Sequence, residues 1–173
     1  MTTQLIIIMG VSGSGKTTLA KKLAKELCWH YMEADDYHTE DAKHMMATGI
    51  PLTDVIREPW IQAMYDQLIQ YSKKNISTVL SYSGLKKKHR DIFRKLPIPL
   101  QFVHLIGEKY LIRQRMDNRK GHFMASHMLD SQFDALESTE LETNVLHINI
   151  EQSIEQQVAT IKKELNNKKG TKQ

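Results

Sequence analysis

Residues 5–17 read LIIIMGVSGSGKT, and this stretch decides the fold class. The apolar run at residues 5–9 has the length of a buried strand. A glycine-rich turn follows, and beyond it Leu19, Leu23 and Leu27 recur at every fourth residue, which is typical of a helix with one apolar face. A buried strand joined by a tight turn to a helix is the repeating unit of a parallel sheet wrapped by helices, so the stretch predicts an α/β fold.

The turn itself predicts a site for phosphate groups. It matches the pattern Gly-x-x-x-x-Gly-Lys-Ser/Thr at every fixed position. The glycines let several backbone amides converge on one phosphate, and the helix N-terminus adds a partial positive charge. Lys16 can reach the outer phosphates of ATP, and the Thr17 hydroxyl can bind Mg²⁺. The predicted ATP-binding residues are Gly10, Val11, Ser12, Gly13, Ser14, Gly15, Lys16, Thr17 and Thr18.

The class of nucleotide-binding protein follows from what accompanies this motif. The sequence has no Asn-Lys-x-Asp motif, which a GTPase would use to read its base, and a motor ATPase normally needs a longer chain than 173 residues. These observations favour a small-molecule kinase that uses ATP and Mg²⁺.

The rest of the chain repeats the alternation of short apolar runs and helical patterns. It predicts a three-layer P-loop NTPase fold, in which helices flank a five-stranded parallel sheet, as a single kinase domain over residues 1–173. We expect one helix to begin at Pro59, because a missing amide proton costs nothing in a first turn. Strands are expected at 5–9, 31–33, 76–81, 100–105 and 145–150, and helices at 17–27, 41–48, 59–74, 88–95, 108–118, 126–136 and 153–166.

The acceptor side of the reaction is predicted beyond the second strand. The carboxyl ends of parallel strands face the ligand crevice, so Asp35 there would face the γ-phosphate and take the proton of an acceptor hydroxyl. Asp36 is the second choice, and both acids have the alternative role of capping the next helix. Arg57, at an expected helix start, can bind a substrate carboxylate or pair with a local acid. The basic run at residues 86–90 suits an anionic ligand or a solvated surface.

A mobile helical lid is predicted over about residues 115–136. Arg115 and Arg119 are four residues apart and would project from one helix face before a glycine-containing loop. On a lid, such arginines neutralise charge on the transferring phosphoryl group, so we expect both to be catalytic. The alternative is an exposed basic helix.

Composition places the protein among soluble cytoplasmic proteins that bind small molecules. The net charge is +4, much of it in a basic tail at residues 168–172, and no motif for nucleic acid accompanies it. No apolar run approaches the roughly 20 residues of a membrane span, and no signal peptide precedes the first strand. The single Cys28 allows no internal disulfide and fits a reducing compartment.

Several motifs in order resemble those of the bacterial-type gluconate kinases, which are related to shikimate and nucleoside monophosphate kinases. Besides the phosphate loop, the resemblance rests on residues 34–38, 49–54 with Arg57 and Pro59-Trp60, 83–87 with Arg90, and 119–123 with 128–129 and 132–133. It implies an ATP- and Mg²⁺-dependent transfer to the 6-hydroxyl of gluconate, usually by a homodimer. It also implies that Asp35, His38, Arg57 and Lys86 bind the acceptor.

The resemblance has departures near the expected acceptor pocket. The family pattern Asn-Asp-x-Asp-Arg is Thr53-Asp54-Val55-Ile56-Arg57 here, and an expected Asn and Lys are Ala42 and Met45. They leave two alternatives open. One is a kinase of the same fold that acts on another small hydroxy acid or sugar. The other is a non-catalytic nucleotide-binding relative.

Overall fold

The protein is described by a computed structural model, which covers residues 3–48, 50, 52–118 and 126–170. Its centre is a five-stranded parallel sheet in the order β2-β3-β1-β4-β5. The strands are β1 (Leu5–Met9), β2 (His30–Glu33), β3 (Thr78–Ser81), β4 (Leu100–Ile106) and β5 (Val145–Asn149). The predicted α/β class and the five parallel strands are therefore confirmed.

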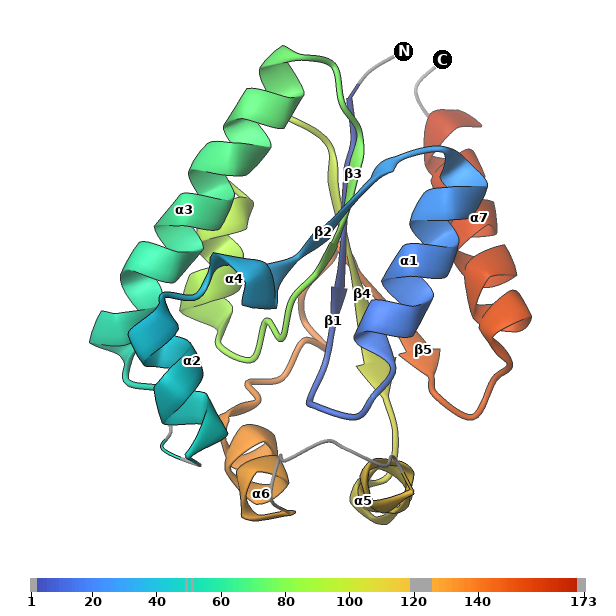
Figure 1. Cartoon of the computed structure of the whole chain (residues 1–173). Helices are drawn as coiled ribbons and strands as arrows, with labels where there is room; N and C mark the ends of the chain where they lie inside the picture. The colour runs from blue at the N-terminus through green and yellow to red at the C-terminus, as the bar shows by residue number, and fades with distance from the viewer. Residues whose placement is uncertain (1–2, 49, 51, 119–125, 171–173) are drawn as a thin grey trace.

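Helices cover both faces of this sheet (Figure 1). One face carries α1 and α7, and the other carries α3 and α4, while α2, α5 and α6 lie near the carboxyl ends of the strands. The helices are α1 (Lys16–Leu27), α2 (Glu40–Ala47), α3 (Asp54–Lys73), α4 (Lys87–Phe93), α5 (Lys109–Asp117), α6 (Ser126–Ala135) and α7 (Ile154–Gly170), with a short 3₁₀ helix η1 (Ala34–Tyr37).

Strand β1 shows why its run is apolar throughout. Successive side chains of a strand point to opposite faces, and this central strand is covered on both. Ile6 and Ile8 belong to the hydrophobic cluster that includes Leu19 of α1, whereas Ile7 belongs to the opposite cluster, with Ile61 of α3. All five residues of β1 are buried, so the sheet is fixed at the strand that leads into the phosphate loop.

The third helix begins five residues before the predicted start. It runs from Asp54, so the prediction that Pro59 occupies its first turn is wrong. Pro59 has no amide proton to donate to the Val55 carbonyl. Val55 is 77% exposed, so water can satisfy that carbonyl and the helix passes through the proline. As a consequence, Arg57 lies within the first turn of α3 and does not precede the helix.

The other predicted elements agree with the structure to within a few residues at their ends. The 3₁₀ helix η1 was not among the predicted elements, because residues 34–37 show no apolar period. Within the described ranges, no helix combines the length and apolar character needed to cross a membrane.

Candidate active site

The phosphate loop connects β1 to α1 at the carboxyl end of the sheet. Gly13 and Gly15 have φ angles of +77° and +99°, which L side chains rarely adopt, and Gly15 is the N-cap of α1. The Lys16 ammonium donates to the Val11 carbonyl at 2.9 Å and so bends back over its own loop. The loop therefore turns through backbone conformations that glycine permits, with its lysine folded against it.

An acidic side chain that the sequence analysis did not single out faces the start of α1. The Thr17 hydroxyl donates to Glu33 Oε2 at 2.9 Å, and the Tyr31 phenol donates to the same oxygen at 2.5 Å. Burial, and then the bond to Glu33, raise the pKa of Tyr31, so its phenol stays protonated as a donor. Glu33 is the last residue of β2 and lies two residues before Asp35. This pair of acids at the end of a strand is the sequence pattern from which a role for Glu33 could have been predicted.

Asp35 lies in η1, directly beyond β2, and lines the same cleft as Lys16. Enclosure by the cleft walls, and then the negative charge of Glu33, raise the pKa of Asp35, while the nearby Lys16 opposes the rise. Solvent still reaches 79% of the Asp35 side chain, so the carboxyl is accessible from the cleft. Asp36 is also exposed, but it is absent from the cleft-lining residues, so Asp35 is the one of the two acids that lines the cleft.

His38 lies behind Asp35, stacked on the indole of Trp60 with ring centroids 3.9 Å apart. Its Nε2 is 3.9 Å from Asp35 Oδ1, and its buried Nδ1 has no hydrogen-bond partner among the described residues. Burial, and then the Arg57 and Lys43 cations, lower the pKa of His38 to about 4, so the ring is neutral at pH 7. The Trp60 indole donates to the Ala34 carbonyl at 2.7 Å, and this bond fastens η1 to α3.

Cations from two separate segments gather around Asp54. Lys86 Nζ lies 3.0 Å from Asp54 Oδ1, Lys88 Nζ lies 2.7 Å from Oδ2, and Arg57 Nη1 lies 3.9 Å from Oδ1. Hydrogen bonds from Lys88 and Lys86 hold the pKa of Asp54 well below its usual range. One carboxylate therefore positions several cations and leaves a net positive charge, which suits an anionic acceptor.

A cleft of about 410 Å³ brings these groups together. It is lined by the phosphate loop, the end of β2 with η1, the start of α3, the segment after β3, and the inner sides of α5 and α6. A volume in this range is typical of small-molecule sites. The sequence-predicted site residues that line it are Ser12, Gly13, Lys16, Thr17, Asp35, His38, Arg57 and Lys86.

Other predicted residues do not reach the described part of the cleft. Arg115 is exposed and donates to the Ile150 carbonyl at 3.0 Å, so the structure directs its guanidinium to the loop after β5 and away from the cleft. Arg119 lies outside the described residues, as does most of the loop within the predicted lid. Ala42, Met45 and Ile56, the departures from the family pattern, are also absent from the cleft-lining residues, whereas Met46 is present.

Gln132 of α6 was named in the sequence only as part of a motif. In the structure its side chain reaches the phosphate loop and contacts Ser12. No periodicity could have revealed this contact, because the partners are 120 residues apart in the chain.

Comparison with known proteins agrees with this geometry. Residues 5–139 match the family described as "AAA domain". The "Probable gluconokinase" of Rattus norvegicus is 35% identical over 91% of this chain and 95% of that protein. Crystal structures of a sugar kinase from Janibacter sp. HTCC2649 and of a gluconokinase from Sinorhizobium meliloti 1021 superpose with TM-scores of 0.90 and 0.83 at 36% and 31% identity. They cover 95% and 96% of this chain, and 95% and 98% of their own. The chain belongs to the gluconokinase family of P-loop kinases.

Proposed function

We propose that the protein is an ATP-dependent gluconokinase, which transfers the γ-phosphoryl group of ATP to the 6-hydroxyl of D-gluconate and releases 6-phosphogluconate and ADP. The observation that carries the proposal is that one cleft is lined by Lys16 of the phosphate loop, by the Asp35 carboxylate, and by the cations Arg57 and Lys86. Relatives that bear the name gluconokinase support the choice of acceptor.

On the donor side, the backbone amides of the phosphate loop would bind the β- and γ-phosphates. The Lys16 ammonium would exchange the Val11 carbonyl for phosphate oxygens, because an ionised acceptor forms the stronger bond. Arg115 and Arg119 remain proposed phosphate ligands. Arg115 would have to leave the Ile150 carbonyl to act in this way.

On the acceptor side, Asp35 would orient the attacking hydroxyl and accept its proton as transfer proceeds. Arg57 and Lys86 would bind the gluconate carboxylate. In the structure both lie beside the Asp54 carboxylate, which has the same negative charge as the carboxylate of gluconate. The neutral His38 ring beside Asp35 would serve as a hydrogen-bonding partner for a hydroxyl group of the sugar acid.

Magnesium fits the oxygen ligands at the start of α1. The Thr17 hydroxyl and the Glu33 carboxylate lie 2.9 Å apart and offer the hard oxygen ligands that Mg²⁺ prefers. When bound, Mg²⁺ neutralises charge on the β- and γ-phosphates. We propose that Thr17 would bind the ion and that Glu33, which accepts the Thr17 hydroxyl proton, would hold that hydroxyl in place.

An ADP-release assay with several acceptors tests the proposal. The purified protein is supplied with MgATP and, in separate reactions, with gluconate, other aldonates, shikimate or a nucleoside monophosphate. We expect gluconate to give the highest kcat/KM and the Lys16→Ala variant to release no ADP above background. A preference for shikimate or a nucleotide would reject gluconate as the acceptor, and no magnesium-dependent ATP binding would reject the kinase assignment.

We also propose a cytoplasmic homodimer whose partners are small molecules, without nucleic acid or membrane. The family resemblance supports the dimer, and the single Cys28, which is exposed, fits a reducing compartment. Sedimentation equilibrium of the purified protein tests the dimer, because a mass near the 20.0 kDa of one chain would exclude it.

A further inference from the structure

One polar side chain of α6 forms two hydrogen bonds with the phosphate loop. Gln132 Oε1 accepts the Ser12 backbone N–H at 2.6 Å, and Gln132 Nε2 donates to Ser12 Oγ at 2.9 Å. The two bonds have opposite polarity and end on the same residue, so together they fix the orientation of the Gln132 amide and of the Ser12 side chain. Both residues line the cleft, which places this contact at the edge of the phosphate site.

The next residue of the loop is confined from the side of α5. A Cβ atom added to Gly13 would lie 2.5 Å from Met116 Cγ, closer than real Cβ atoms approach, and 3.2 Å from Ile112 Cγ2, which is a tight contact. Together with a φ angle of +77°, this close approach to α5 favours glycine at this point. Ser12 and Gly13 are thus held from two directions, by hydrogen bonds from α6 and by close packing against α5.

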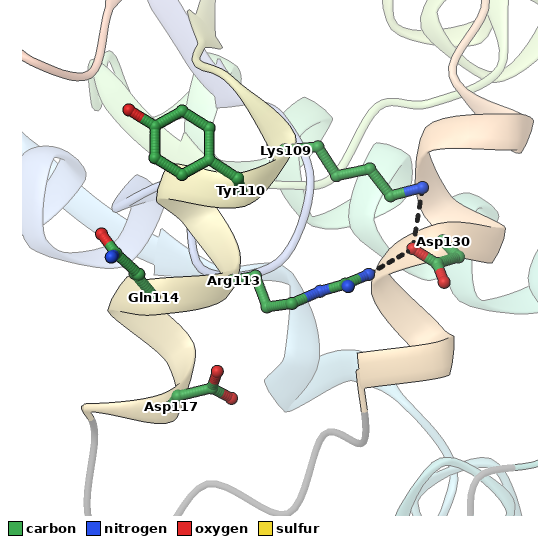
Figure 2. A pocket seen from close by; sticks show the side chains of 6 residues that line it. All are labelled: Lys109, Tyr110, Arg113, Gln114, Asp117 and Asp130. Atoms are coloured by element: carbon green, nitrogen blue, oxygen red, sulfur yellow. Dashed lines mark hydrogen bonds and ion pairs between the residues drawn. The ribbon is translucent and has the colours of Figure 1, made fainter.

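The two helices are also linked to each other. Figure 2 shows Lys109 and Arg113 of α5 directed toward Asp130 of α6, and each cation lies 2.8 Å from Asp130 Oδ1. All three side chains are more than 40% exposed, and water screens such pairs, so they contribute little to holding α6 in place. Leu129 packs α6 into the hydrophobic core, and the partly buried contact between Gln132 and Ser12 adds a directional polar link from α6 to the phosphate loop.

We propose that Gln132 is a positioning residue for phosphoryl transfer, acting through Ser12. It fixes the Ser12–Gly13 part of the loop and the separation of the loop from Met128 and Ser131, the α6 residues across the cleft. Transfer depends on groups that are already aimed at the developing charge, and a displacement of about 1 Å can cost about a hundredfold in rate. The inference rests on the proposed kinase function for its kinetic readout.

The test uses variants that remove the bonds in steps. Gln132→Leu removes both bonds and keeps most of the volume, while Ser12→Ala removes only the bond to the hydroxyl. The matched control is Gln62→Leu, since Gln62 is an exposed glutamine of α3 that bonds only Asp66 among the described residues. We expect Gln132→Leu to lower kcat about tenfold to a hundredfold, with the gluconate KM changed less than about twofold.

The double variant separates positioning from general stabilisation. If Gln132 acts through Ser12, Ser12→Ala should lower kcat less than Gln132→Leu does, and adding Ser12→Ala to Gln132→Leu should lower it little further. Additive effects would overturn the proposal, and so would a kcat within about twofold of wild type for Gln132→Leu. A higher ATP affinity in Gln132→Leu with unchanged kcat would show that Gln132 competes with phosphate for the Ser12 amide, and this would overturn it too.

An amide-exchange measurement keeps this inference separate from the choice of substrate. If the wild-type protein phosphorylates no gluconate, the proposed function fails, but the Ser12 amide can still be followed by hydrogen exchange in the nucleotide-free protein. We expect exchange at Ser12 to be several-fold faster in Gln132→Leu than in wild type and Gln62→Leu. Equal exchange in all three would show that Gln132 does not hold the loop.

Discussion

The substitution Arg90→Met tests the packing that supports the acceptor side of the cleft. Arg90 is completely buried and donates to the Gly84 carbonyl at 2.7 Å and the Leu85 carbonyl at 3.0 Å. Its guanidinium also pairs with Glu142 Oε1 at 2.5 Å, and the Glu142 side chain is only 8% exposed. Arg90 therefore ties the segment that leads to Lys86 to the loop that precedes β5.

The magnitude follows from what the substitution leaves behind. Breaking a buried ion pair costs about 3–5 kcal/mol, because the remaining charge stays buried without its partner. Glu142 keeps a second cation, Arg94, and Leu85 keeps a donor in the Glu137 amide at 2.9 Å. The Gly84 carbonyl loses its 2.7 Å bond to Arg90, and the carbonyls of Glu137 and Ser138 lose longer bonds of 3.3 and 3.4 Å. We therefore expect a loss of about 3–4 kcal/mol, near the lower end of that range, from a total stability of about 5–15 kcal/mol.

Urea unfolding followed by circular dichroism measures this loss. The control is Arg113→Met, which removes an arginine that is 43% exposed and paired with Asp130, and which should cost less than about 1 kcal/mol. A loss for Arg90→Met no larger than that of the control would refute the reasoning. We also expect a higher gluconate KM in Arg90→Met, because Lys86 directly follows the carbonyls that Arg90 holds.

Three further predictions concern the cleft. Asp35→Asn should lower kcat about a hundredfold or more and leave the ATP dissociation constant within about threefold, since only the proton acceptor is lost; full turnover would remove Asp35 from the mechanism. Arg57→Ala should raise the gluconate KM about tenfold with a smaller change in kcat, and an unchanged KM would show that Arg57 does not touch the acceptor. Stability should fall as the pH is lowered from 6.5 to 4, because the native pKa of His38 is about 4 against 6.5 unfolded, so the unfolded state binds the extra proton. Burial also lowers the pKa of His104 to about 4, so His38→Gln should reduce this loss of stability without abolishing it. Urea midpoints at pH 7 and pH 5 measure the loss. An equally steep loss in His38→Gln would contradict the lowered pKa of His38.

Strands β1 and β3 could be predicted because the first is wholly apolar and the second is rich in β-branched residues. The run at residues 5–9 is buried from end to end, and this left no competing interpretation. The start of α3 could not be predicted from Pro59, since a proline in a helix depends on whether the carbonyl it leaves free can reach water. That is a property of the surroundings of Val55, which is exposed.

Part of the site could be predicted because parallel strands end at one edge. Asp35 after β2 and Lys86 after β3 meet there for that reason, together with the phosphate loop after β1. The pairing of Asp54 with Lys86 and Lys88 could not be predicted from the sequence, because a contact across more than 30 residues leaves no local pattern. The prediction that Arg115 projects toward the phosphate side rested on its helical spacing from Arg119 alone. Spacing could not reveal the Ile150 carbonyl, which accepts a hydrogen bond from the Arg115 guanidinium in the structure.

The most direct test of the proposed reaction is to identify its product. The wild-type protein is incubated with ATP, Mg²⁺ and gluconate, and the mixture is followed by phosphorus NMR with proton correlation. We predict a single phosphate ester that couples to the protons on carbon 6, formed in step with ADP and absent without Mg²⁺ or in Lys16→Ala. An ester at another carbon, or ATP that stays intact beside gluconate, would contradict the assignment.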